Sequence, residues 1–169
     1  MTDPRLRRIA PSLLVAVMLL ATACTLERRE PPPSAGSEAR AAVLAELRSY
    51  YTDLSARDWP AFASHFWPGA TITTAWQPPG EPFVRVDAQT VPEFIERAPE
   101  GPDSRAVFSE ELVSADIRVA GNLAQAWVRY RARFGDPGDV EEWEGTDAFS
   151  LLQVDGRWKI IALAFAPDR

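Results

Sequence analysis

Only a few residues of this 169-residue chain could carry out acid–base chemistry. Asp147 lies in a strand-like run between Gly145 and Phe149, where its neighbours on the same strand face include aromatic rings. Removal of water by such rings would raise the pKa of the carboxyl towards neutrality, which suits a general base. The alternative is an ion pair between Asp147 and an arginine of an adjacent strand, such as Arg129 or Arg131.

Two further candidates for proton transfer are His65 and Tyr130. His65 is the single histidine, and at the mouth of a pocket its imidazole could relay protons. The alternative is a structural histidine whose ring nitrogens are satisfied by nearby groups. One histidine without clustered carboxylates predicts no metal site, and no glycine-rich phosphate loop or Gly-x-Ser-x-Gly turn is present. We therefore expect neither a metal nor a cofactor.

Large aromatic side chains are the second signal for a site. The chain has six tryptophans and three tyrosines, and rings that carry one polar atom suit a ligand cavity as well as a core or a dimer contact. If they form a binding site, we expect a cavity of roughly 300 Å³ or more lined by tryptophans. The pocket residues that we predict are Tyr51, Phe66, Trp76, Trp127, Tyr130, Trp143 and Asp147.

Cys24 is the only cysteine, and its position predicts a lipid anchor. It follows a basic start and an uncharged run over residues 11–23, which at roughly 20 Å of helix is too short to span a bilayer. The junction Leu20-Ala21-Thr22-Ala23-Cys24 resembles the lipobox of bacterial lipoproteins, although that family usually has leucine where Ala21 stands. The resemblance implies acylation of Cys24 and a place on the extracytoplasmic side of the cell membrane or outer membrane.

These features divide the chain into three parts. We predict a lipoprotein signal peptide over 1–23, an acylated cysteine with a proline-rich tether over 24–37, and a folded domain over 38–169. The chain carries 18 basic and 24 acidic residues, a net charge of −6. Because nucleic-acid binding needs a concentrated basic surface, this balance argues against a nucleic-acid partner.

The folded part alternates between helical and strand-like patterns. Apolar residues recur at three- and four-residue spacing after Ser37, the predicted N-cap of a long helix. Shorter helices are predicted in 58–67 and, with Thr90 as cap, in 90–98. Asp155-Gly156 predicts a tight hairpin turn. The predicted strands are 70–76, 83–86, 106–119, 122–134, 141–154 and 157–166.

This element order resembles the nuclear transport factor 2-like superfamily, which includes ketosteroid isomerases and polyketide cyclases. The segments that carry the resemblance are ARDWPAFASHFWPGATI (56–72) and GTDAFSLLQVDGRWKIIAL (145–163). The resemblance implies an α+β fold, in which a strongly curved, mixed, mostly antiparallel sheet wraps around the N-terminal helix and forms a cone with a pocket. It also implies frequent dimerisation through the sheet. Related cyclases and isomerases use an aspartate in the cone.

Three functions are consistent with these observations. The first is a lipid-anchored domain that binds a small apolar or amphipathic molecule without catalysis. The second is an envelope module for protein–protein interaction or assembly. The third is a cofactor-free acid–base enzyme, an isomerase, dehydratase or cyclase that uses Asp147 with His65 or Tyr130. A fold by itself does not choose among them.

Overall fold

Helix α1 (Ala35–Ala56) presents the apolar stripe around which the rest of the domain is built. Its buried side chains come at three- and four-residue spacing, as the sequence predicts. The computed structural model describes residues 35–76 and 82–168. In it α1 starts at Ala35, so Ser37 lies in the first helical turn and is not the N-cap. The buried residues of α1 are Val43, Leu47, Tyr50, Tyr51 and Leu54.

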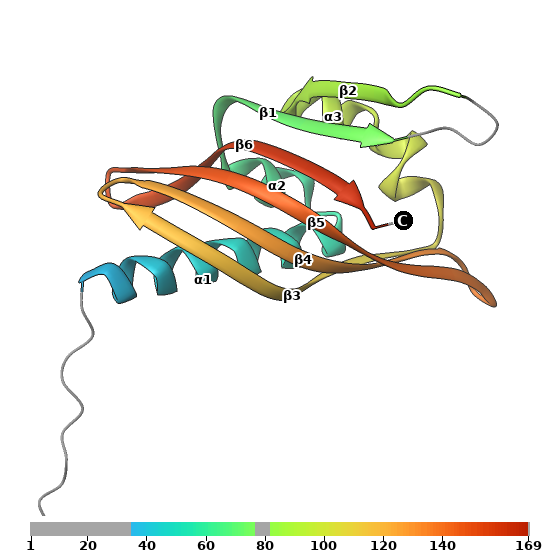
Figure 1. Cartoon of the computed structure of the whole chain (residues 1–169). Helices are drawn as coiled ribbons and strands as arrows, with labels where there is room; N and C mark the ends of the chain where they lie inside the picture. Colours follow the sequence, from blue (N-terminus) through green and yellow to red (C-terminus); the bar gives the residue numbers. More distant parts are fainter. Residues whose placement is uncertain (1–34, 77–81, 169) are drawn as a thin grey trace, which may run out of the picture. The chain divides into compact units, whose positions relative to one another are not determined.

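Two short helices and six strands follow α1 (Figure 1). The short helices are capped by side chains, Asp58 for α2 and a Thr90–Glu93 capping box for α3. The elements are α2 (Trp59–Ser64), β1 (Phe66–Trp76), β2 (Arg85–Thr90), α3 (Val91–Glu96), the 3₁₀ turns η1 (Ala98–Glu100) and η2 (Pro102–Ser104), β3 (Val107–Ala120), β4 (Leu123–Asp136), β5 (Asp139–Val154) and β6 (Arg157–Pro167).

The six strands form one sheet in the order β2-β1-β6-β5-β4-β3. The β1–β6 pair is parallel and every other pair is antiparallel. α1 and α2 lie on the same face of this sheet (Figure 1), which we call the inner face; the opposite face is the outer face. The predicted α+β class, with a mixed and mostly antiparallel sheet around the N-terminal helix, is confirmed.

The second helix is shorter than predicted and β1 begins earlier. The aromatic residues Phe66 and Trp67 belong to β1, because the His65 carbonyl accepts a hydrogen bond from the Ile160 amide and Phe66 pairs with Ile160. The register then shifts before Thr71. Strand pairing with β6 therefore overrides the helical spacing of the aromatic residues.

The hairpin turn between β5 and β6 is the one that the sequence predicts. Asp155 and Gly156 both have positive φ, 49° and 77°, the pattern of a type I′ turn. A type I′ turn matches the twist of its strands, so it fixes the register that pairs Val154 with Arg157. The register then shifts by one residue between Ser150 and Leu151, and beyond this shift Asp147 lies opposite Phe165.

The predictions for residues 1–23 and Cys24, and for the tether up to residue 34, fall outside the described residues. Within 35–76 and 82–168, no helix is long and apolar enough to cross a membrane.

Candidate functional site

An apolar cavity of about 190 Å³ lies between α1 and the inner face of the sheet. It is smaller than the expected 300 Å³, and phenylalanine and tyrosine rather than tryptophan supply its aromatic walls. An apolar cavity of about 150 Å³ accommodates benzene, so the volume suits a single ring. The lining residues are Tyr50, Leu54, Ile72, Phe94, Pro102, Phe108, Glu110, Asp147, Leu163 and Phe165.

Asp147 is one of the two carboxylic acids in this cavity. Strand alternation puts it on the inner face with Phe149, and it is 2% exposed. Its Oδ2 accepts a hydrogen bond from the Tyr51 hydroxyl of α1. Within the described structure Asp147 therefore has a tyrosine as its partner, where the sequence left an arginine open.

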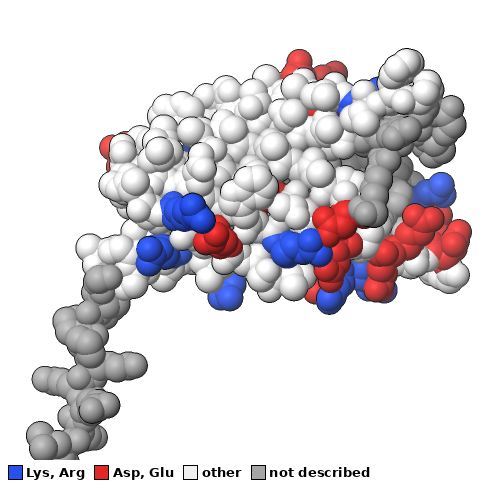
Figure 2. All heavy atoms as spheres, viewed as in Figure 1, with Lys and Arg blue, Asp and Glu red and all other residues white. Residues whose placement is uncertain are grey.

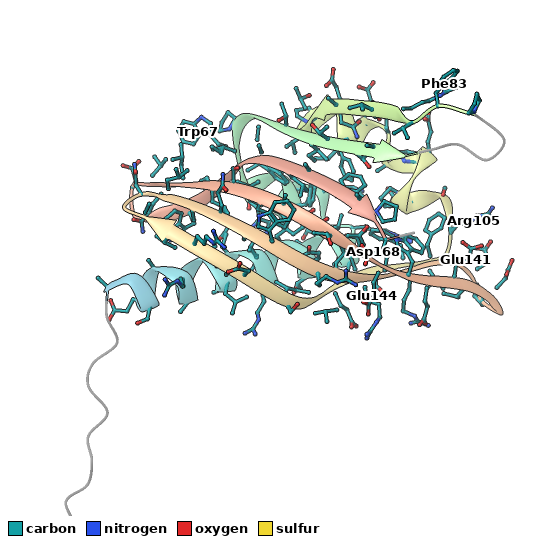
Figure 3. All side chains as sticks on the ribbon, viewed as in Figure 1. Trp67, Phe83, Arg105, Glu141, Glu144 and Asp168 are labelled. Atoms are coloured by element: carbon teal, nitrogen blue, oxygen red, sulfur yellow. The ribbon has the colours of Figure 1, made fainter. Side chains whose placement is uncertain are left out.

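The arginines proposed as partners of Asp147 lie on the opposite face of the sheet. Val128 is paired with Asp147, so Arg129 and Arg131 point outwards from β4. Both bind Glu144, at 2.8 and 3.1 Å, and Arg129 also binds Asp168. Figure 3 shows Glu144 and Asp168 at this part of the sheet.

Glu110 is the second carboxylic acid and was missed by the sequence analysis. Its backbone exchanges two hydrogen bonds with the Ser55 hydroxyl, at 2.8 and 2.9 Å, which ties β3 to α1. Among the described residues its carboxyl has no hydrogen-bond or ion-pair partner. A signal was present, because Glu110 occupies an inward position between Phe108 and Leu112 in an alternating strand.

The two carboxyl groups are weak acids. Burial raises the pKa of Asp147 to about 7, against the opposing effect of the Tyr51 hydrogen bond. Burial, and then the negative charge of Asp147, raise the pKa of Glu110 to about 8. Since both values lie near or above neutrality, the pair retains at least one proton at pH 7. One group can then donate a proton while the other accepts one.

Three tyrosine hydroxyls surround the pair and remain protonated. Burial, followed by the charge of Asp147, raises the pKa of Tyr50 and of Tyr51 well above the usual range. Burial and the charges of Glu110 and Asp147 do the same for Tyr130. Each hydroxyl is therefore a hydrogen-bond donor rather than a base.

Tyr130 is held beside the cavity by its neighbours on β5. Its hydroxyl interacts with the side chain of Trp143, and its ring lies over Gly145 on the paired strand. A Cβ atom added to Gly145 would come within 2.3 Å of the Tyr130 hydroxyl oxygen. Gly145 is therefore needed for this ring position. Tyr130 is buried but is not among the residues that line the cavity.

His65 does not reach the cavity. Its ring is buried between α1 and β1, where Nδ1 lies 2.8 Å from a Glu46 oxygen and Nε2 lies 2.8 Å from an Asp53 oxygen. Burial lowers the pKa of His65, but the hydrogen bonds and charges of the two carboxylates outweigh this and raise it overall. His65 therefore has a structural role: its two hydrogen bonds tie the end of α2 to α1.

The other residues predicted to line the pocket lie in different places in the structure. Trp127 is 60% exposed on the outer face, opposite Ala148, because it alternates with the inward residues of β4. Its prediction as a pocket residue is wrong for that reason. Phe66 belongs to the buried core. Trp143 is partly buried and packs against that core. The side chain of Trp76, at the end of β1, lies outside the described residues.

The outer face of the sheet is mixed in character. In Figure 2 the charged side chains gather towards one edge of the visible face, and uncharged atoms cover most of the rest. The outward residues of β4 form ion pairs with β5, among them Arg133–Glu142 and Arg129–Glu144, both at 2.8 Å. No group of three or more potential metal-ligand side chains occurs in the part of the chain that the structure describes.

Comparison with known proteins identifies the family. Residues 38–166 match the family model described as "Putative lumazine-binding". No curated protein matches the sequence. The solved structures that match include a protein of unknown function from Mycobacterium tuberculosis, with a TM-score of 0.63 and 15% identity over 78% of this chain and 73% of that one.

Two other solved structures are similar to the same extent. A Novosphingobium aromaticivorans protein described as "Putative Scytalone Dehydratase" has a TM-score of 0.63 and 15% identity, over 78% of this chain and 85% of its own. A nuclear transport factor 2-like superfamily protein from Salmonella enterica has a TM-score of 0.62 and 12% identity, over 79% and 93%. At these identities the likeness shows the fold alone. The chain belongs to the lumazine-binding-like family and has the nuclear transport factor 2-like fold.

Proposed function

We propose that the domain binds one small apolar or amphipathic molecule, of about the size of a single ring, in the apolar cavity. The observation that carries this proposal is a partly open apolar space of about 190 Å³ with an unpartnered carboxyl, that of Glu110, in its wall. Leaving such a carboxyl without a partner costs free energy, which a ligand that donates a hydrogen bond would recover. Ligand-binding cavities are typically apolar with a few polar groups, as here.

The comparisons support small-molecule binding in general, but not the ligand size, because lumazine is a two-ring compound. The family description reads "Putative lumazine-binding", and one similar structure is described as a "Putative Scytalone Dehydratase". The volume argues for a ligand no larger than a single ring with a short substituent.

A second candidate function is acid–base catalysis without a cofactor, and the pairing of Asp147 favours it. A general base must not be neutralised by a permanent cation, and Asp147 faces a tyrosine rather than an arginine. Tyr51 would position Asp147, and Glu110 would exchange protons with the substrate. An isomerisation, dehydration or cyclisation needs such a pair of groups with pKa values near neutrality.

The location of the domain is a separate proposal. We propose that the chain is exported and anchored to the cell membrane or outer membrane through acyl groups on Cys24, with residues 24–37 as a tether.

A homodimer through the sheet, or an assembly partner in the envelope, would use the outer face. The exposed Trp127 and Leu123, which are 60% and 41% exposed, support that alternative.

Native mass spectrometry of the full chain purified from its own host tests the binding proposal. We expect a bound species of about 100 Da, scaled from benzene in a 150 Å³ cavity. Leu163→Trp, which fills part of the cavity from β6, should abolish it. Leu123→Trp makes the same exchange at an exposed position of β4 and should retain it. A bound species that survives Leu163→Trp would contradict the site.

A further inference from the structure

The polar side chains that line the apolar cavity are acidic or neutral. They are Glu110, Asp147 and Tyr50, and no lysine, arginine or histidine is among the described lining residues. The cavity therefore has two acidic groups that accept hydrogen bonds and no fixed positive charge. Such a site discriminates among ligands of equal size by their charge.

The described residues supply only one side-chain hydrogen bond to the two carboxyl groups. Asp147 accepts one hydrogen bond through Oδ2 from Tyr51. The side chain of Glu110 accepts none from the described residues, although its backbone is fully engaged with Ser55. A ligand that supplies several N–H donors would satisfy both carboxyl groups at once.

One arginine packs against a ring of the cavity wall and is already paired with an acid. Arg57 lies with Cζ 5.7 Å from the centre of the Phe108 ring. Its guanidinium is 3.5 Å from Asp103 and donates a 2.8 Å hydrogen bond to the Arg105 carbonyl. Arg57 is outside the set of lining residues, so it does not offset the carboxyl groups for a ligand.

The aromatic walls favour the same ligand charge as the carboxyl groups. Phe94, Phe108 and Phe165 contribute rings to the cavity. A cation next to an aromatic face is attracted by the negative face of the ring, whereas an anion would face two acids. The rings also provide apolar surface for a ring of the ligand.

We infer that the cavity selects a monocyclic primary amine, bound as its ammonium ion with the N–H groups on Glu110 and Asp147 and its ring against the phenylalanines. This inference rests on the proposed function, that the cavity binds a small molecule, and specifies the chemical class of that molecule. Catalysis is not required by it.

Three probes of nearly equal size test the inference on the full chain. Benzylamine, benzyl alcohol and benzoate are titrated at pH 7.5 by isothermal calorimetry. We expect benzylamine to bind about tenfold more tightly than benzyl alcohol, as one charged hydrogen bond provides, and benzoate not to bind. In Glu110→Gln the ratio of benzylamine to benzyl alcohol affinity should fall towards one. Glu111→Gln, which removes the same charge at an exposed neighbouring position, should keep the ratio.

The outcomes separate this inference from the proposed function. Equal binding of the amine and the alcohol would overturn the selectivity and leave small-molecule binding standing. Tighter binding of benzoate would overturn it as well. If none of the probes binds and Leu163→Trp leaves native mass spectra unchanged, both proposals fail. Asp147→Asn provides a second variant if Glu110→Gln does not fold, and it should lower the same affinity ratio.

Discussion

Glu110→Gln should stabilise the protein at alkaline pH and leave its stability unchanged at acid pH. The raised pKa of Glu110 means that the folded state holds a proton there that the unfolded state has already lost. Between about pH 4.5 and pH 8 the folded state therefore binds more protons, so the free energy of unfolding falls as the pH rises. Glutamine has nearly the same shape and no proton to lose, so the variant escapes this loss.

The magnitude follows from the pKa. A rise from 4.5 to about 8 corresponds to a ceiling of about 5 kcal/mol, at 1.36 kcal/mol for each pKa unit. Because the Glu110 side chain is only partly buried, water screens part of the charge. We expect a gain of about 2–3 kcal/mol at pH 9, a shift in the urea midpoint of about 1–2 M.

Urea unfolding of the full chain, followed by tryptophan fluorescence from pH 4 to pH 9, measures this gain. Glu111→Gln is the matched control, because Glu111 is exposed and lies outside the cavity lining. The control should differ from the parent chain by the same small amount at every pH. A constant difference between Glu110→Gln and the parent, or a parent chain that gains stability towards pH 8, would refute a protonated Glu110.

Three other changes test separate parts of the molecule. Gly145→Ala should cost about 1–3 kcal/mol in urea unfolding, because the added methyl meets the Tyr130 ring. His65→Gln should destabilise most at pH 6 and less at pH 9, since a raised histidine pKa gives stability that is lost as the pH rises through it. Cys24→Ser should move the protein from the membrane to the soluble fraction and remove the mass of the acyl chains.

Each of these has its own contrary result. An unchanged urea midpoint for Gly145→Ala would mean that the Tyr130 ring is free to move. If His65→Gln destabilises the protein equally at both pH values, the protonated state of His65 does not contribute to its interaction with Glu46 and Asp53. Membrane retention of Cys24→Ser, in the fractionation that shows the parent chain bound, would leave the anchor to another part of the chain.

Several features of the site could be predicted from strand alternation alone. Asp147 shares a phase with Phe149, and the Asp155-Gly156 turn fixes the pairing of β5 with β6 next to the turn. Glu110 could have been found in the same way, as an acid at an apolar phase of β3. Alternation also shows that Trp127 and Tyr130, three residues apart on one strand, cannot both line a pocket.

Alternation does not say which phase faces inwards, and here the tertiary structure decided. α1 packs against the sheet face that carries Tyr130. Tyr130 is therefore buried, and Trp127, on the opposite face, is exposed to solvent. The same packing gave Asp147 its partner Tyr51, 96 residues away in the sequence.

The sequence by itself determined most of the elements, the Asp155-Gly156 turn and the alternation along each strand, because these depend on residues a few positions apart. Only the tertiary structure brought Glu110 and Asp147 into one cavity, since β3 and β5 are separated by β4 and meet across the curvature of the sheet. The raised pKa values of the two acids follow from that burial and proximity. Neither pKa shift can be read from local spacing in the sequence, because desolvation depends on everything that packs around a group.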